Sequence, residues 1–252
     1  MGVRRTATQG LARWTGATRV PGTKKGVRRV KGAIGDVLPF ALVVTISPIN
    51  IIAAIVLLFS KRPVVNAASY VVGFVVGVAA MLGALVAIAG TVDLAAGTGT
   101  ATGAGGIRIA LGVALLVAAI AKFRSAPKAG EPASLPKWMD GLAMFAPVKS
   151  LGLGVLIGAL NPKNIAMAIA AALSIASVGL TGGQQVVVVV VYVVLAVLGV
   201  AAPVVVALVL GDRSQPVLAS WKAWLERNNP VVMGVLFLVF SVVLVGKGIA
   251  AV

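Results

Sequence analysis

The 252-residue sequence contains no cysteine, no histidine and only six aspartate and glutamate residues. The first two absences exclude disulfides, thiol chemistry, zinc sites built from Cys and His, and histidine general bases. The few acids are scattered, so paired carboxylates for catalysis or for a hard metal ion are not expected either. We therefore expect no enzyme, no metal and no cofactor.

Charge of either sign is scarce. Only 11% of the residues are charged and 60% are hydrophobic, whereas about a quarter of an average soluble domain is charged. Water cannot solvate such a chain as a compact globule, which leaves the bilayer as its solvent. The composition predicts an all-α membrane protein, because helices satisfy every backbone hydrogen bond internally.

The charge that is present is mostly positive, with 22 Lys and Arg residues. They flank apolar runs and are not interleaved with aromatic residues, so we expect anionic lipid headgroups as partners and no nucleic acid. Nine of them lie in residues 1–31, which predicts a disordered basic tail beside the membrane. A signal peptide fits poorly, because the following apolar run is too long; a translation start near Val30 stays open.

Six apolar runs follow, and each is long enough for a membrane-spanning helix: 37–59, 67–90, 107–123, 150–178, 185–210 and 230–246. The valine-rich fifth run would indicate a β-strand in water, but its length favours a lipid-embedded helix. Trp138, Trp221 and Trp224 lie in connections and are expected at headgroup depth.

The sharpest signal is an internal repeat. The sequence SPINI at 47–51 recurs as NPKNI at 161–165, 114 residues later, and both read polar-Pro-x-Asn-Ile. A weaker echo, offset by 122, links Gly112 to Gly234. We therefore predict one transmembrane domain, 32–252, with repeats 32–123 and 149–252 and a linker, 124–148. Three spans per repeat turn the second copy over, so two inverted three-helix repeats are expected.

The repeated prolines predict helix breaks at bilayer depth, because proline lacks an N–H and clashes with the preceding turn. Irregular backbone at that depth is tolerated where protein buries it or where it lines a wet cavity. The predicted substrate path contains Ser47, Pro48, Asn50, Asn161, Pro162, Lys163 and Asn164. The alternative is a pair of kinked helices that pack through small residues, with the asparagines bonding between helices.

Lys163 lies beside the second break, and Asp36 lies at the head of the first apolar run. Lys163 either faces a cavity or a partner, or extends to an interface. Asp36 is the best-placed acid for a coupling proton or a lysine partner, although an acid at a helix N-terminus needs no such role.

The orientation signals conflict. The connections after runs one, three and five hold Lys and Arg, which places them in the cytoplasm and both termini outside. The basic tail favours the opposite orientation.

The two motifs, together with Asp36-Val37-Leu38-Pro39 and Pro136-Lys137-Trp138, resemble the actinobacterial GAP or sulfolipid-addressing protein family. That family lies within the lysine-exporter (LysE) superfamily, and the resemblance covers about residues 32–250. It implies a six-helix protein of the plasma (inner) membrane that moves glycolipids or related envelope molecules. Members of the wider superfamily export amino acids and ions.

The sequence therefore predicts a transporter or translocation factor for an envelope lipid or another small molecule. A non-transporting scaffold of a lipid-export or lipid-synthesis complex is the main alternative, and an amino-acid exporter is a further one. Such machinery and a second copy of the chain are the partners left open. Substrate identity and the coupling ion are not encoded in any recognisable motif.

Overall fold

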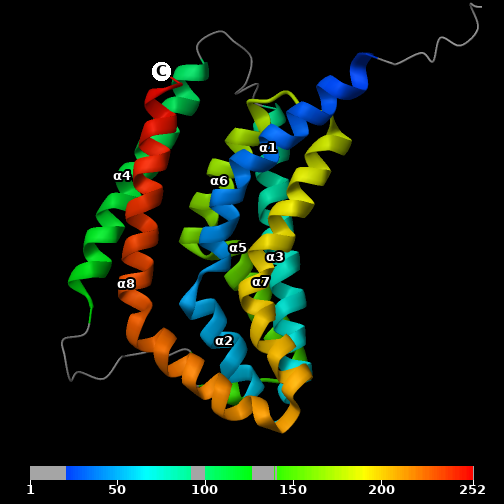
Figure 1. Ribbon diagram of the computed structural model, residues 1–252, viewed down its shortest axis with the longest axis vertical. Helices are drawn as coiled ribbons and strands as arrows, with labels where there is room; N and C mark the ends of the chain where they lie inside the picture. Colours follow the sequence, from blue (N-terminus) through cyan, green and yellow to red (C-terminus); the bar gives the residue numbers. More distant parts are fainter. Residues whose placement is uncertain (1–20, 92–99, 127–138, 140, 252) are drawn as a thin grey trace, which may run out of the picture.

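The computed structural model describes residues 21–91, 100–126, 139 and 141–251, and these residues are almost entirely helical (Figure 1). The helices are α1 (Pro21–Thr45), α2 (Pro48–Leu58), α3 (Pro63–Thr91), α4 (Thr100–Arg124), α5 (Pro147–Leu160), α6 (Pro162–Ala176), α7 (Gly182–Leu210) and α8 (Ser214–Ile249), with the short 3-10 helices η2 (Leu142–Met144) and η3 (Gly211–Arg213). The predicted helical class is confirmed, and the valine-rich fifth run is helix α7.

Three helical segments are long and apolar enough to cross a membrane: Pro63–Gly90, Gly105–Arg124 and Gly182–Ile249. Two further candidates are bent pairs, α1 with α2 at 50° and α5 with α6 at 54°. If each bent pair is one span, the count rises to five. The segment Gly182–Ile249 itself contains two α-helices, α7 and α8, joined through η3.

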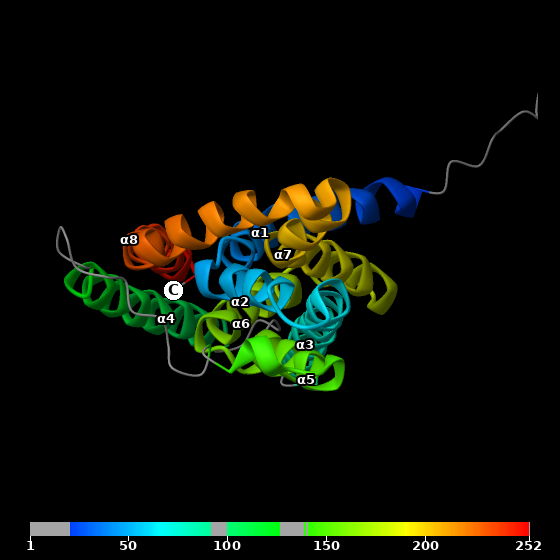
Figure 2. The same ribbon diagram turned by 90° about the horizontal axis from the view of Figure 1, so that it is seen from below.

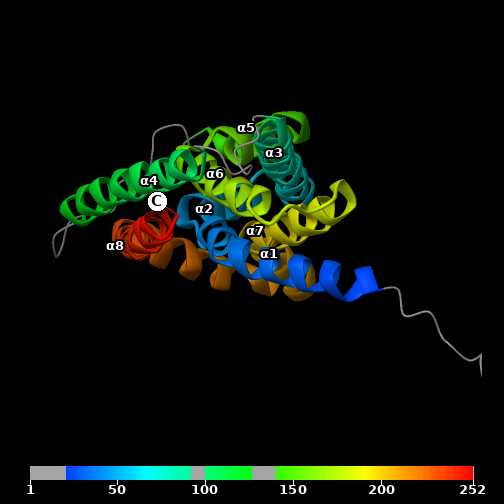
Figure 3. The ribbon, with the colours of Figure 1, turned by 90° about the horizontal axis from the view of Figure 1, so that it is seen from above.

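The two helices that follow the breaks occupy the centre of the molecule. Seen from below and from above, α2 and α6 lie between the α4–α8 pair on one side and α3, α5 and α7 on the other (Figures 2 and 3). Eight of the 11 residues of α2 and ten of the 15 residues of α6 are buried. The outer helices instead expose many apolar side chains, which suits contact with lipid.

Small residues allow close helix packing between α3 and α5. A Cβ atom added at Gly73 or Gly77 would collide with the α5 backbone, and one added at Gly154 or Gly158 would collide with the α3 backbone. This is the small-xxx-small arrangement by which membrane helices approach each other. It holds the first half of one broken pair against the long helix of the other repeat.

Helix α1 extends into the region that the sequence analysis assigns to a basic tail. Helix α1 begins at Pro21, so residues 21–31 of the predicted basic tail form its first turns, with Lys25, Arg28 and Arg29 exposed. Residues 1–20 and most of the 124–148 linker lie outside the described residues.

Candidate functional site

The first helix break falls at the predicted Ser47-Pro48 pair. Ser47 is extended (φ −116°, ψ 99°) and precedes α2, whose first residue is Pro48. In a continuous helix, the carbonyls of Val43 and Val44 would accept bonds from residues 47 and 48. Ser47 has left the helix and Pro48 has no N–H, so the break frees both carbonyls.

The second break repeats this geometry. Asn161 is extended (φ −66°, ψ 121°), and its Oδ1 accepts a 3.0 Å hydrogen bond from the backbone N–H of Lys163, which caps α6. The carbonyls freed here belong to Ile157 and Gly158. Asn164 is a hydrogen-bond partner for both carbonyls, because its Nδ2 donates to the Ile157 oxygen at 3.0 Å and to the Gly158 oxygen at 3.4 Å.

Lys163 connects the two breaks. Its side chain is buried, and its Nζ donates to the Val43 carbonyl at 2.8 Å. Val43 corresponds to Ile157 at the repeat offset of 114, so Lys163 satisfies in the first break the carbonyl that Asn164 satisfies in the second. The sequence left open whether Lys163 faces inward or extends to an interface, and in the structure it faces inward.

Asn50 is left without a side-chain partner. It is fully buried, and neither its Nδ2 nor its Oδ1 has a hydrogen-bond partner among the described residues. Asn164 Oδ1 and the hydroxyl of Tyr192 share this condition. An unsatisfied buried polar group costs about 1–3 kcal/mol, so these atoms are candidate contacts for water or for a polar part of a substrate.

Two buried tyrosines were not identified by the sequence prediction. Tyr70 and Tyr192 are the only tyrosines in the chain, and both are almost completely buried. The hydroxyl of Tyr70 donates to the backbone carbonyl of Asn50 at 3.3 Å. The two tyrosines are 122 residues apart, the offset that links Gly112 to Gly234, and this spacing was the signal that could have identified them.

Asp36 forms an ion pair with Lys247 on α8, with Nζ and Oδ1 2.7 Å apart. The same ammonium lies 5.7 Å from the centroid of the Phe40 ring. Arg108, nine-tenths buried on α4, also interacts electrostatically with Asp36. The structure thus gives Asp36 a lysine partner, but brings it to Lys247 and not to Lys163.

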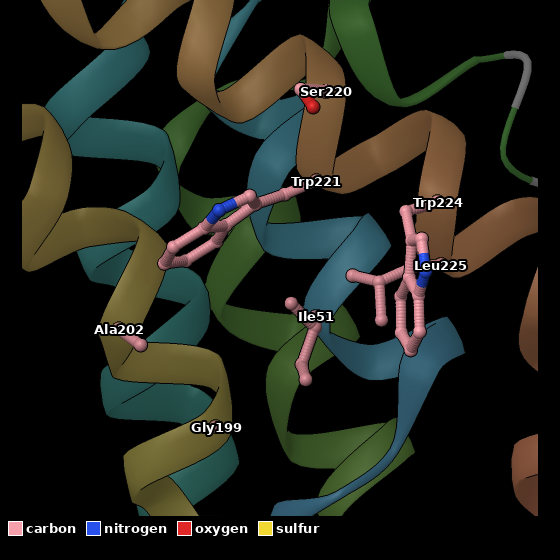
Figure 4. A pocket seen from close by; sticks show the side chains of 7 residues that line it. All are labelled: Ile51, Gly199, Ala202, Ser220, Trp221, Trp224 and Leu225. Carbon is pink, nitrogen blue, oxygen red and sulfur yellow. The ribbon is translucent and has the colours of Figure 1, made fainter.

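A hollow of about 460 Å³ lies beside the first break, and sequence reasoning did not identify it. Its lining comes from Ile51 on α2, from Gly199 and Ala202 on α7, and from four residues of α8 that include Trp221 and Trp224 (Figure 4). Its walls are largely apolar, and the tryptophans expected to anchor the protein at headgroup depth form part of them.

Apolar outer helices surround α2 and α6, the two buried central helices that follow the breaks, and this arrangement defines a helical membrane protein. A family model described as Sap, sulfolipid-1-addressing protein, matches residues 37–250. The chain belongs to this family, which confirms the family predicted from the motifs and indicates a lipid-related membrane role. Placement in the lysine-exporter superfamily stays a prediction. No curated protein and no solved structure matches the chain.

Proposed function

We propose that the chain is a multi-pass transporter or translocation factor of the plasma (inner) membrane. It would move an envelope lipid, or another small molecule, along a path between its two broken helices. The family description and the apolar helices support a lipid-related role in a membrane. The six proposed spans are α1–α2, α3, α4, α5–α6, α7 and the part of α8 that follows Pro230.

Reciprocal contacts between α4 and α8 support the inverted repeat. A Cβ added to Gly112 would lie 2.7 Å from Val245, and one added to Gly234 would lie 2.8 Å from Phe123. Adding 122 to 112 and 123 gives 234 and 245, so one contact occurs twice with the helices exchanged, as a two-fold axis requires. The colours in Figure 1 agree, because each helix of the first half runs opposite to its counterpart.

The observation that carries the proposal is the bond from Lys163 to Val43. It is one charged contact between the two halves, at the place where both backbones are interrupted. Intramembrane cations are costly and mark substrate or ion paths, and paired broken helices are where transporters bind their substrates. If Lys163 released the Val43 carbonyl and bonded to the substrate instead, substrate binding would be coupled to movement of one repeat against the other. No Walker motif occurs in the sequence, so an ion gradient or an ATPase partner would supply the energy.

The test is Lys163→Met in proteoliposomes with fluorescent lipids, whose transfer between leaflets is followed by dithionite quenching. We expect translocation to fall to the protein-free background, because the cation that bridges the breaks is gone. Lys149→Met, at an exposed lysine near the start of α5, is the control and should translocate normally. Normal translocation by Lys163→Met would refute the path.

The same experiment separates transport from the scaffold alternative. A scaffold needs only packed helices, so purified wild-type protein would then move no lipid in the absence of other proteins. Addition of radiolabelled amino acids to the same vesicles tests the amino-acid exporter.

A further inference from the structure

The hollow between α2, α7 and α8 adjoins the proposed path. Ile51, in its wall, follows Asn50 directly. Gly199, in the opposite wall, lies so close to the Thr45 carbonyl that a Cβ would collide with it. Thr45 also donates from Oγ1 to the Leu195 carbonyl at 2.6 Å, which holds α7 against the end of α1. The hollow therefore adjoins the first break on both sides: Ile51 follows the break in the chain, and Gly199 packs against Thr45, which precedes it.

The lining suits hydrocarbon. In Figure 4, the Trp221 ring extends from α8 toward Ala202 on α7, and Leu225 lies between Trp224 and Ile51. Ser220 supplies the one hydroxyl among the lining residues. Apart from that hydroxyl and the two indole N–H groups, the lining side chains are apolar, and an acyl chain needs no polar partner.

A second hollow, of about 400 Å³, adjoins the first across Trp224, which lines both. Arg227 and Asn228 contribute to its lining. The neighbouring acid, Glu226, is paired with Lys222 at 2.6 Å, so Arg227 has no ion-pair partner within the described part of the chain. An exposed guanidinium presents a planar fork of donors that matches phosphate, sulfate or carboxylate groups.

We propose that the two hollows together bind one anionic lipid from the adjoining leaflet. One acyl chain lies between α2, α7 and the two tryptophans, and the headgroup lies against Arg227 and Asn228. The site rests on the proposed function, for which it is the lateral entrance: a lipid held there has its chain beside Ile51, one residue from the unpartnered Asn50 amide. Trp224 separates the apolar part from the charged part, which is the position of tryptophan at a membrane interface.

Tryptophan fluorescence tests the site directly. In a Trp14→Phe, Trp138→Phe background, all indole emission comes from Trp221 and Trp224. The protein is reconstituted in phosphatidylcholine vesicles that contain increasing fractions of lipid brominated on its acyl chains. We expect brominated phosphatidylglycerol to quench at lower mole fractions than brominated phosphatidylcholine. Arg227→Gln should raise the phosphatidylglycerol fraction needed about fivefold, the value of one interfacial cation.

Two matched pairs of variants locate the lipid. Arg213→Gln removes an exposed cation close to the start of α8 that lines neither hollow, and should leave the quenching unchanged. Ala202→Phe fills the apolar hollow and should abolish the preference for the anionic lipid, whereas Ala219→Phe, at an exposed position of α8 outside both linings, should keep it.

Equal quenching by the two lipids, or an equal effect of Arg213→Gln and Arg227→Gln, would reduce the site to a general surface charge and overturn the proposal. An unchanged preference of Ala202→Phe for quenching by brominated phosphatidylglycerol would also overturn the proposal. The quenching measurement requires no transport, so the two proposals can fail separately. The lipid site can be refuted while Lys163→Met still abolishes translocation, and the lipid site can be supported while Lys163→Met translocates normally.

Discussion

Two asparagines that are equivalent in sequence differ in their bonding. Asn164 donates to the carbonyls freed by its own break. Asn50 has the same position relative to Pro48, but Lys163 already occupies the Val43 carbonyl that corresponds to Ile157. The repeat is therefore asymmetric at its most polar point, and the surplus hydrogen-bonding capacity belongs to Asn50.

This asymmetry predicts opposite changes in stability. Asn50→Leu removes a buried amide without partners and should stabilise the protein by about 1–3 kcal/mol. Asn164→Leu leaves two carbonyls unpaired and should destabilise it by about 1 kcal/mol, the scale of hydrogen bonds within membranes. Unfolding in mixed micelles at increasing SDS fractions measures both.

Lipid translocation by the same two variants then separates stability from function. Both should lose it, since the polar lining of the path is reduced in each. Equal destabilisation by the two variants would mean that Asn50 has a partner in the folded protein.

The sequence predicted the two helix breaks but not the hydrogen bonds around them. The proline-asparagine repeats identified both breaks, because a proline at bilayer depth has a local steric consequence. The bond from Lys163 to Val43 joins residues 120 apart, and nothing local specifies it. The hollow beside Trp221 forms only when α8 crosses α2 and α7, so its residues show no shared spacing.

At the scale of helices, proline alone does not determine a break. Pro39, Pro203 and Pro230 all lie inside continuous helices. Asn229-Pro230 even has a polar residue before the proline, as the two broken motifs do. The residue two positions after Pro230 is Val232, whereas both broken motifs have asparagine two positions after the proline. At the second break, that asparagine donates to the freed carbonyls. The full polar-Pro-x-Asn pattern therefore predicts the break better than the proline does.

Packing between α3 and α5 gives a prediction at the same scale. Gly154→Ala should destabilise the protein by about 1–3 kcal/mol, because its Cβ would meet the backbone of Tyr70 and Phe74. Gly152→Ala changes a glycine two residues earlier on α5, which has open space around it. It should be neutral or stabilising, by up to about 1 kcal/mol, because alanine favours the helix.

The SDS-unfolding assay compares these two alanine variants under identical conditions. A similar stability for both would show that α3 and α5 are farther apart in the membrane than the structure places them. The contrast depends on one methyl group at two glycines of the same helix, so differences in hydrophobicity cannot account for it.

At the scale of the whole molecule, the basic residues fail to identify the cytoplasmic side. Lys25, Arg28 and Arg29 are exposed on the first turns of α1. In Figure 1 these turns lie at the end of the bundle opposite to the α2–α3 and α7–α8 connections, to which Lys61 and Arg213 belong. The orientation conflict in the sequence is thus retained in the fold. Apolar run length predicts candidate spans, but the two separated basic clusters give opposite orientations by the positive-inside rule.

The absence of cysteine makes the topology directly measurable, because any single introduced cysteine is unique. Lys61→Cys and Thr181→Cys replace exposed residues in the connections that follow the two broken pairs. An odd number of spans separates these connections if the repeats are inverted, so a membrane-impermeant maleimide added to intact cells should label only one of them. We expect Thr181→Cys to be labelled, and Lys61→Cys only after lysis, because three basic connections favour the cytoplasm on the side of Lys61. Arg213→Cys should behave as Lys61→Cys does. Labelling of Lys61→Cys and Thr181→Cys from the same side would mean that the two halves are parallel, and the two breaks could not then face each other across a shared path.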